Sequence, residues 1–306
     1  MSNTIFTSNN LPDLSGKTII VTGGNSGLGA ESVKVFAEQG AQIVMAVRSI
    51  EKGEEVKSTF LKVCDDLAID VMQLDLTNLQ SIKSFAQQFK AKYTKLDILL
   101  NNAGIMIPPY QTTTDGFESQ MGTNHMGHFA LTGLLMDVLS KTPGARVVNV
   151  SSIAHKMGKM DFNNLMYEGG KNYNATKAYG RSKLANLLFT FELQRYFEKN
   201  KIQAISVAAH PGVSQTNLFK FAADAWYAKF LLPVFKLMIQ SSRMGAMPQI
   251  YASIADNVKG GEYYGPGGLR EMWGYPTLVK AKDEAYNTND ARQLWEVSEK
   301  LTGVKF

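Results

Sequence analysis

Short apolar runs rich in β-branched residues alternate with longer amphipathic stretches along most of this chain. Lys17–Thr22 and Gln42–Val47 predict strands, and Ser26–Gln39 between them has the length and apolar spacing of a helix. The same pattern predicts further strands at Asp70–Leu74, Leu96–Leu100, Arg146–Val150 and Gln203–Ala208, and further helices after Ser49 and at Leu79–Lys92, Phe117–Ser140 and Asn174–Lys199. Strands that are joined through helices pair in parallel. The chain is therefore expected to form an α/β fold, a doubly wound parallel sheet with helices on both faces.

The length and composition fit one such domain. The 306 residues would allow one or two domains, and 44% hydrophobic against 19% charged residues can fill a sizeable core. No repeat or low-complexity linker interrupts the alternation of strands and helices. We therefore expect a single domain over residues 1–306, with a variable segment at about Val213–Met244 inserted before the last helix and strand.

Charge, hydropathy and cysteine content exclude several classes of protein. The net charge of +5 comes from scattered basic residues, so no nucleic-acid partner is expected. Met1–Lys17 is polar and no apolar run reaches the ~18 residues of a membrane span, so a soluble, cytoplasmic protein is expected. The single cysteine, Cys64, rules out an internal disulfide and a cysteine-rich metal site. His125 and His128 offer too few ligands for a metal and are expected to be packed or exposed.

A glycine-rich turn follows the first predicted strand and opens the first predicted helix. Gly23, Gly27 and Gly29 form a G-x-x-x-G-x-G pattern, which lets a pyrophosphate approach backbone N–H groups and the positive end of the helix. Ala30 follows the last glycine where a nucleoside-triphosphate site needs a lysine, so a dinucleotide is the expected ligand. The alternative is a turn used only for packing. The expected cofactor contacts in this turn are Gly23, Asn25, Ser26, Gly27, Leu28 and Gly29.

Arg48 ends the second predicted strand, where NAD-binding folds usually carry an acid for the ribose 2′-hydroxyl. A guanidinium suits a 2′-phosphate instead, and Lys52 lies one helical turn further along. NADP(H) is therefore the preferred cofactor, with NAD(H) as the second choice. An exposed arginine without a ligand is the alternative.

Four motifs, in order along the chain, resemble those of the short-chain dehydrogenase/reductase family. They are the glycine turn, Asn101–Gly104, Ser151–Ser152 and Tyr179–Lys183. The resemblance covers nearly the whole chain and implies a Rossmann-type fold. Three stretches are similar to the retinol-dehydrogenase-like branch of the family and its bacterial relatives: Asn124–Phe129, Asn149–His155 and Ala178–Asn186.

The resemblance implies a catalytic tetrad. Tyr179 would be the acid/base, and Lys183 would hold the nicotinamide ribose. Ser152 would bind the substrate oxygen, and Asn124 would keep a water in a proton relay. Further cofactor contacts are implied at Asp75, Leu76, Asn102, Ala103, Gly104, Tyr179, Lys183, Pro211, Gly212 and Thr216. For Asp75, a helix-capping role together with Thr77 and Asn78 is about equally expected.

Tyr179 and Lys183 are four residues apart in a predicted helix and therefore share a face. An ordinary phenol titrates near ~10, and bringing its pKa close to neutrality requires roughly 4 kcal/mol of phenolate stabilisation. The adjacent ammonium is expected to supply this stabilisation.

Tyr173 and Lys177 form a second Y-x-x-x-K pair six residues upstream, and both pairs cannot be catalytic. Six helical positions turn the chain by about 240° net, so the two pairs would face different ways. Asn174 is a good N-cap and places Tyr173 just outside the helix. Tyr179 is therefore preferred, and Tyr173 is interpreted as a wall or helix-entry residue.

Two further interpretations come from the family pattern. Ser152 is preferred to Ser151 because the second serine of such a pair is usually the catalytic one. The 27 residues from Ser152 to Tyr179 exceed the usual spacing, so His155–Asn172 is interpreted as an insertion on the pocket rim.

Together these features predict an NADP(H)-dependent oxidoreductase that interconverts an alcohol and a carbonyl. A catalytically silent NADP-binding sensor or scaffold is the alternative, which the filled tetrad disfavours. The apolar and aromatic segment Leu218–Gln240 predicts a lid over a lipophilic substrate, while a core helix or a segment lying on a membrane surface are the other interpretations. The family also implies a homodimer or homotetramer, paired through the helices predicted at Phe117–Ser140 and Asn174–Lys199.

Overall fold

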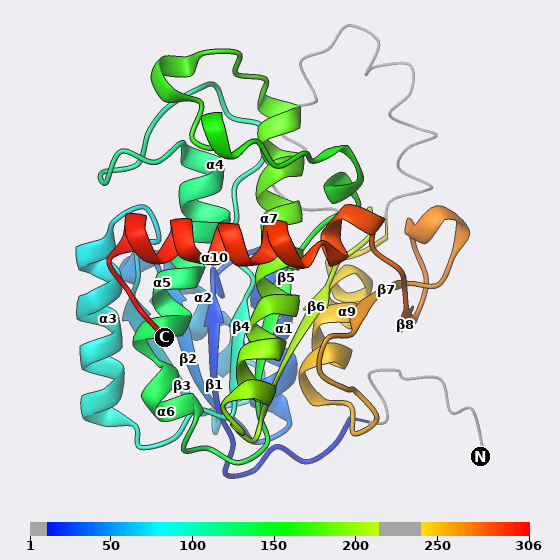
Figure 1. The fold of residues 1–306 in the computed structure, drawn as a ribbon. Coiled ribbons are helices and arrows are strands. Elements are labelled where there is room, and N and C mark those ends of the chain that lie inside the picture. The colour runs from blue at the N-terminus through cyan, green and yellow to red at the C-terminus, as the bar shows by residue number, and fades with distance from the viewer. Residues whose placement is uncertain (1–10, 214–239) are drawn as a thin grey trace, which may run out of the picture.

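The computed structural model describes residues 11–213 and 240–306, which form one eight-stranded sheet flanked by helices (Figure 1). The strands are β1 (Thr18–Thr22), β2 (Gln42–Val47), β3 (Ile69–Gln73), β4 (Ile98–Asn101), β5 (Ala145–Val150), β6 (Ala204–Ala209), β7 (Tyr263–Pro266) and β8 (Pro276–Leu278). Their order in the sheet is β3-β2-β1-β4-β5-β6-β7-β8, and β8 alone among them runs antiparallel to its neighbour. The predicted doubly wound, mostly parallel sheet is confirmed.

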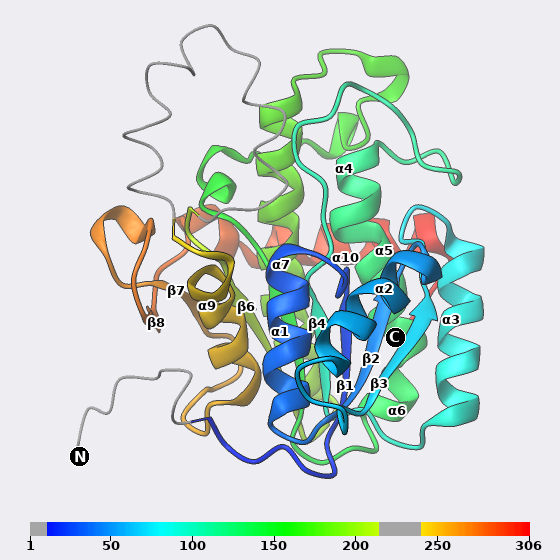
Figure 2. The same ribbon diagram turned by 180° about the vertical axis from the view of Figure 1, so that it is seen from behind.

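Helices cover both faces of this sheet. They are α1 (Gly27–Glu38), α2 (Ile50–Leu61), α3 (Leu79–Lys92), α4 (Ser119–Met121), α5 (Gly127–Leu134), α6 (Met136–Leu139), α7 (Ala175–Lys199), α9 (Ser242–Ile254) and α10 (Thr288–Thr302). α3, α5 and α7 lie on the face seen in Figure 1, and α1, α2 and α9 on the face seen in Figure 2. Along β1, Ile19 and Val21 pack with the α1 and α9 side, whereas Ile20 packs with the α3 and α5 side. A strand buried on both faces is therefore apolar throughout.

Some predicted helix boundaries agree closely with the structure. Leu79–Lys92 coincides with α3, and α7 begins directly after Asn174. The Asn174 side chain accepts a hydrogen bond from the Lys177 N–H at 2.9 Å, so it is the N-cap that the sequence predicts. Tyr173 accordingly lies outside the helix.

The single helix predicted over Phe117–Ser140 is wrong. This stretch contains α4, a π-helical turn at Gly122–Met126, α5 and α6. The Glu118 carboxylate precedes α4 and accepts hydrogen bonds from the N–H groups of Gln120 and Met121. Leu135 separates α5 from α6 with φ −102° and ψ 4°. Because the stretch is almost completely buried, its apolar residues lie on all sides and their spacing does not reveal these breaks.

Helix α10, which the sequence analysis did not predict, lies across α7 and α5 (Figure 1). Its Trp295 ring packs 5.4 Å from Phe129 of α5 and 5.9 Å from Phe189 of α7, measured between ring centres. Phe306 joins the same cluster, 4.9 Å from Phe129. Part of the helix surface that the family resemblance suggested for pairing is thus covered by the same chain, and the homodimer or homotetramer stays a prediction.

The segment predicted to be a lid lies almost entirely outside the described residues. Thr216 and residues 218–239 fall in this gap, and Val213 and Gln240–Met244 border it. Among the helices of residues 11–213 and 240–306, none is long and apolar enough to cross a membrane. The same residues contain no group of three or more side chains that could hold a metal. His125 and His128 are buried, as the packing interpretation requires.

Candidate active site

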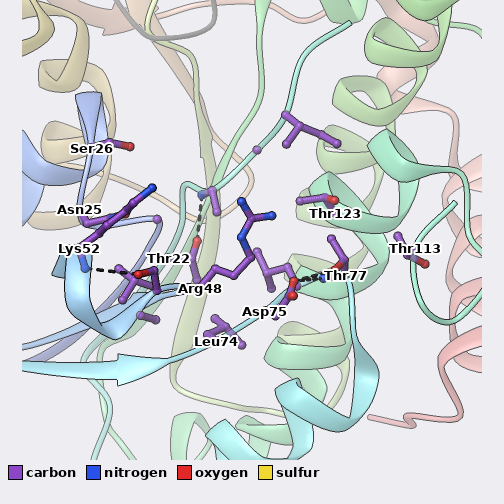
Figure 3. A pocket seen from close by; sticks show the side chains of 18 of the residues that line it. Thr22, Asn25, Ser26, Arg48, Lys52, Leu74, Asp75, Thr77, Thr113 and Thr123 are labelled. Atoms are coloured by element: carbon purple, nitrogen blue, oxygen red, sulfur yellow. Dashed lines mark hydrogen bonds between the residues drawn. The ribbon is translucent and has the colours of Figure 1, made fainter. Parts of the chain in front are cut away.

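A pocket of about 830 Å³ opens at the carboxyl ends of β1, β2, β3 and β4 (Figure 3). The strand order reverses between β1 and β4, and doubly wound sheets bind nucleotides at such a point. Its lining includes the following predicted cofactor contacts: Gly23, Asn25, Ser26, Arg48, Lys52, Asp75, Leu76, Ala103 and Gly104. The pocket has the size and position expected of a nucleotide site.

The glycine turn brings backbone close to this pocket. Gly23 has φ +65°, and a Cβ atom on Gly29 would lie 2.3 Å from the Gly23 carbonyl oxygen, so both positions require glycine. Ser26 is the N-cap residue of α1, but its side chain makes no capping hydrogen bond. The N-terminal N–H groups of α1 are therefore not capped by Ser26, and a helix start of this kind suits a phosphate. Leu28 points instead into the core.

Arg48 and Lys52 place two cationic side chains in the pocket (Figure 3). Ser49 caps α2 by accepting a hydrogen bond from the Lys52 N–H at 3.3 Å, which fixes Lys52 in the first helical turn. Within the described ranges, neither cation has an acidic partner. The two charges are therefore available to an anionic ligand.

Asp75 and Asn102 both make structural contacts. Asp75 lines the pocket, and its carboxylate accepts hydrogen bonds from the N–H and hydroxyl of Thr77, at 2.9 and 2.7 Å. The N-cap of α3 is Asn78 rather than Asp75. The Asn102 side chain donates to the Thr22 carbonyl at 2.7 Å and accepts from Gln249 at 3.1 Å, which ties the ends of β1 and β4 to α9.

The four predicted catalytic residues converge beyond Gly104. A Cβ atom on Gly104 would lie 3.1 Å from Asn124 Oδ1 and 3.4 Å from Lys183 Nζ, so glycine keeps the pocket open toward them. Lys183 Nζ donates to the Val150 carbonyl at 3.0 Å and lies 5.8 Å from the centre of the Tyr179 ring. The Ser152 side chain lies close enough to Tyr179 to oppose the rise in the pKa of the phenol.

The neighbouring Ser151 has a different environment. Its hydroxyl is buried and donates to the Lys183 carbonyl at 2.8 Å, while Ser152 is partly exposed. The structure therefore places Ser152, and not Ser151, beside Tyr179.

Asn124 lies in the π-helical turn between α4 and α5. Its side-chain amide pairs with the backbone of Ile105, accepting from the N–H at 2.8 Å and donating to the carbonyl at 3.0 Å. It also donates to the Ser182 hydroxyl at 2.9 Å. Asn124 thereby joins the loop after β4 to α7, and π turns of this kind recur at functional sites.

Burial controls the charge of the two titrating residues. It raises the pKa of Tyr179 to about 12, against the effect of the Ser152 hydrogen bond, and lowers the pKa of Lys183 to about 8. The expectation that Lys183 lowers the phenol pKa is therefore wrong for the protein by itself. Lys183 Nζ binds the Val150 carbonyl instead of the phenol oxygen, and desolvation prevails.

The competing pair, Tyr173 and Lys177, has no such arrangement. The Tyr173 hydroxyl donates to the Pro108 carbonyl at 2.9 Å and accepts from Gln120 at 3.0 Å, and Lys177 is exposed. The Tyr110 and Tyr167 rings each pack 5.3 Å from Tyr173. Tyr173 therefore belongs to an aromatic wall beside the helix entry.

Pro211 and Gly212 follow β6, away from the lining of the nucleotide pocket. Beside them lie polar residues that the sequence analysis did not single out, above all the buried His210 and the half-buried Glu271. A histidine directly before a Pro-Gly turn was the only local signal. Glu271 is 61 positions after His210 in the sequence, and its neighbours contain no motif that would have indicated a role at the site.

Comparison with known proteins agrees with this geometry. The sequence profile of the family described as short chain dehydrogenase matches residues 17–225. The chain belongs to the short-chain dehydrogenase/reductase family. The retinol dehydrogenase 12 of Mus musculus is 38% identical to this short-chain dehydrogenase over 293 residues, covering 95% of this chain and 88% of that protein. Such relatives assign the chain to the retinol-dehydrogenase-like branch and to the oxidoreductases.

Solved structures extend the comparison. A Mycobacterium paratuberculosis protein described as uncharacterised is 39% identical to this short-chain dehydrogenase, with a TM-score of 0.83 and 99% of both chains covered. Pseudomonas aeruginosa RhlG, solved as an active-site complex with NADP, is 21% identical, with a TM-score of 0.66 over 82% of this chain and 94% of that chain. The RhlG likeness shows a shared fold.

Proposed function

We propose that this short-chain dehydrogenase uses NADP(H) to interconvert an alcohol and a carbonyl on a lipophilic substrate, with Tyr179 as the acid/base. The observation that carries the proposal is the convergence of Ser152, Tyr179 and Lys183 next to Gly104, which lines a pocket suited to a nucleotide. Membership of an oxidoreductase family supports the reaction class.

The residues present fit a dinucleotide. The glycine cradle and the N-terminus of α1 would take the pyrophosphate, Arg48 and Lys52 a 2′-phosphate, and Asp75 and Leu76 the adenine side. Lys183, next to Gly104, would hold the nicotinamide ribose. When bound, the nicotinamide supplies or accepts the hydride. NADP in the RhlG complex supports the choice of cofactor.

Proton transfer is the work of the chain's own side chains. A phenol with a pKa of about 12 is protonated at neutral pH, so Tyr179 can donate its proton to a carbonyl oxygen during reduction. The Ser152 hydroxyl, in contact with Tyr179, would hydrogen-bond the same oxygen. In the direction of oxidation, the alcohol proton passes to the Tyr179 oxygen.

A lipophilic substrate is supported by the surroundings of Tyr173. The aromatic wall of Tyr110, Tyr167 and Tyr173 offers three packed rings. The names of the retinol dehydrogenase relatives also indicate a lipophilic alcohol. A cytoplasmic location and association with a membrane surface both stay predictions.

The test is a panel of retinoids, steroids, aliphatic aldehydes and small hydroxy acids, assayed with NADPH and NADH, and repeated for Tyr179→Phe and Tyr173→Phe. We expect turnover of the bulky apolar carbonyls. Tyr179→Phe should lower kcat by at least about 10³-fold while the cofactor Kd stays within about threefold, because only the proton donor is lost.

Tyr173→Phe is the matched control and should keep most of the activity. Loss of activity in Tyr173→Phe but not in Tyr179→Phe would show that the wrong pair was chosen. Cofactor binding without any turnover across the panel would favour the sensor or scaffold alternative.

A further inference from the structure

Two loops meet beside the reacting centre at the carboxyl ends of β5 and β6. The first, Ser152–Met157, begins with the serine in contact with Tyr179 and forms a 3₁₀ turn. The second, His210–Val213, follows β6, which pairs with β5 up to Ala209. The carboxyl ends of neighbouring parallel strands lie at one edge of the sheet, so both loops border the same site.

A single carboxylate reaches both loops. Glu271, in the connection between β7 and β8, accepts a hydrogen bond from Lys156 Nζ on Oε1 at 2.9 Å. Its Oε2 lies 3.1 Å from Nε2 of His210. Within the described part of the chain, neither buried atom has a hydrogen bond of regular geometry, so their 3.1 Å approach is a close polar contact in which each atom is the other's polar partner. Glu271 is thus the shared partner of a cation in the first loop and an imidazole in the second.

The hydrogen bonds of His210 define its tautomer. The Gly212 N–H donates to Nδ1 at 3.2 Å, so Nδ1 carries no proton and the neutral ring holds its proton on Nε2, toward Glu271. The ring is 1% exposed, and burial lowers its pKa, which keeps it neutral. The carboxylate therefore orients a ring that in turn holds the Gly212 backbone.

The connection that carries Glu271 is shaped to reach this position. Arg270 and Glu271 have φ of +51° and +60°, a left-handed conformation that non-glycine residues rarely adopt. The β7–β8 connection also contacts the second loop through its backbone, because the Val213 N–H donates a hydrogen bond to the Met272 carbonyl at 2.8 Å. A Cβ atom on Gly212 would lie 2.4 Å from that carbonyl oxygen. Two strained residues held by close contacts of this kind indicate a functional constraint.

We propose that Glu271 is a positioning residue that holds the Ser152 loop, through Lys156, and the Pro211–Gly212 turn, through His210, in register beside the reacting centre. The proposal rests on the proposed function for its kinetic consequence. Its structural part, the carboxylate-set tautomer of His210, does not depend on any activity.

The test compares Glu271→Gln, Lys156→Met and their double variant with Glu296→Gln, which removes an exposed carboxylate on α10. The kinetic readout is kcat per NADPH-binding site, with the sites counted by fluorescence titration. Glu271→Gln should lower this kcat about tenfold or more and leave the NADPH Kd within about threefold, because displaced loops misplace the reacting groups. Lys156→Met should have a smaller effect, and the double variant should be no worse than Glu271→Gln.

A purely structural role would lower the melting temperature and the number of sites but not kcat per site. The second readout is long-range ¹H–¹⁵N NMR of the four histidines, which should show His210 with its proton on Nε2 and a change in that signal in Glu271→Gln. Wild-type kcat per site in Glu271→Gln, or a proton on Nδ1 of His210, would overturn the proposal. If the wild-type protein turns over no substrate, the proposed function fails, and the NMR result still decides whether Glu271 orients His210.

Discussion

At the scale of single residues, Arg48 and Lys52 give the pocket its positive end. Both side chains extend into the pocket, and neither has an acidic partner among the described residues. We expect wild-type protein to bind NADPH more tightly than NADH. Arg48→Asp should weaken NADPH binding far more than NADH binding, by about 10-fold or more, because a charge-assisted contact becomes a repulsion. Fluorescence titration of both cofactors measures this, and equal wild-type affinities would contradict it.

The buried charge of Lys183 lowers the free energy of unfolding. Its pKa in the folded protein is about 8, below the value near ~10.4 of an unfolded chain, so folding disfavours its charged form. The free energy of unfolding should therefore rise as the pH increases from about 8 toward 10, and the full penalty of roughly 3 kcal/mol should be present at pH 7. A substitution that removes the Lys183 ammonium also removes its hydrogen bond to the Val150 carbonyl, and this loss offsets part of the gain in stability.

Lys183→Met should accordingly be more stable than wild type at pH 7, by about 1–2 kcal/mol, although it should be inactive. Urea unfolding at pH 7 and pH 10 measures the difference, which should shrink at the higher pH. A Lys183→Met protein that is less stable than wild type at pH 7 would refute this account of the buried ammonium.

The sequence was sufficient to place Tyr173 outside the helix and Tyr179 inside it, because Asn174 marks the start of the helix locally. It was not sufficient for the pKa of Tyr179, which depends on burial by residues distant in the chain. It also could not reveal Glu271, since contact with His210 and Lys156 depends on how the β7–β8 connection folds back.

At the scale of elements, α7 organises the rim of the site through Arg181. This buried guanidinium donates to the carbonyls of Lys159, Asn164 and Leu165 and lies 4.1 Å from the centre of the Tyr167 ring. It fixes much of His155–Asn172, the stretch interpreted as an insertion, onto the start of α7. The structure thus gives this stretch a defined anchor.

Arg181→Met should cost about 3 kcal/mol in the free energy of unfolding, because three carbonyls lose their donors. It should also raise KM for the substrate and leave the NADPH Kd nearly unchanged, since neither Arg181 nor the residues it binds line the nucleotide pocket. Arg195→Met, further along α7 and partly exposed, is the matched control and should cost less than about 1 kcal/mol. Equal losses in the two variants would argue against the anchoring role.

Element prediction succeeded where a boundary has a local chemical signal and failed where it does not. Asn78 and Asn174 are N-caps, and the helices after them begin as predicted. The π turn, α5 and α6 begin without a side-chain cap, and the glycines of this buried stretch, Gly122, Gly127 and Gly133, are not accompanied by a proline. Gly127, at the start of α5, packs tightly, since a Cβ atom there would approach the Leu76 carbonyl to 2.5 Å.

At the scale of the whole molecule, the described sheet and helices leave no apolar face of α5 and α7 open for a second copy. α10 covers that face with Trp295, and its outer residues Arg292, Gln293 and Glu296 are exposed and polar. We expect a monomer of 33.7 kDa at micromolar concentration, because stable homodimers bury larger and more apolar surfaces. Light scattering coupled to size-exclusion chromatography measures the mass, and a particle of twice that mass would contradict the expectation.

The position of α10 also has a consequence for synthesis on the ribosome. Phe129 and Phe189 become available for packing when α5 and α7 emerge, but Trp295 and Phe306, which cover them, are made about a hundred residues after α7 ends. During that interval the nascent chain presents an uncovered aromatic face, which is the kind of surface that aggregates or recruits chaperones. Docking of α10, rather than formation of the sheet, is then the step that removes this aromatic surface from solvent.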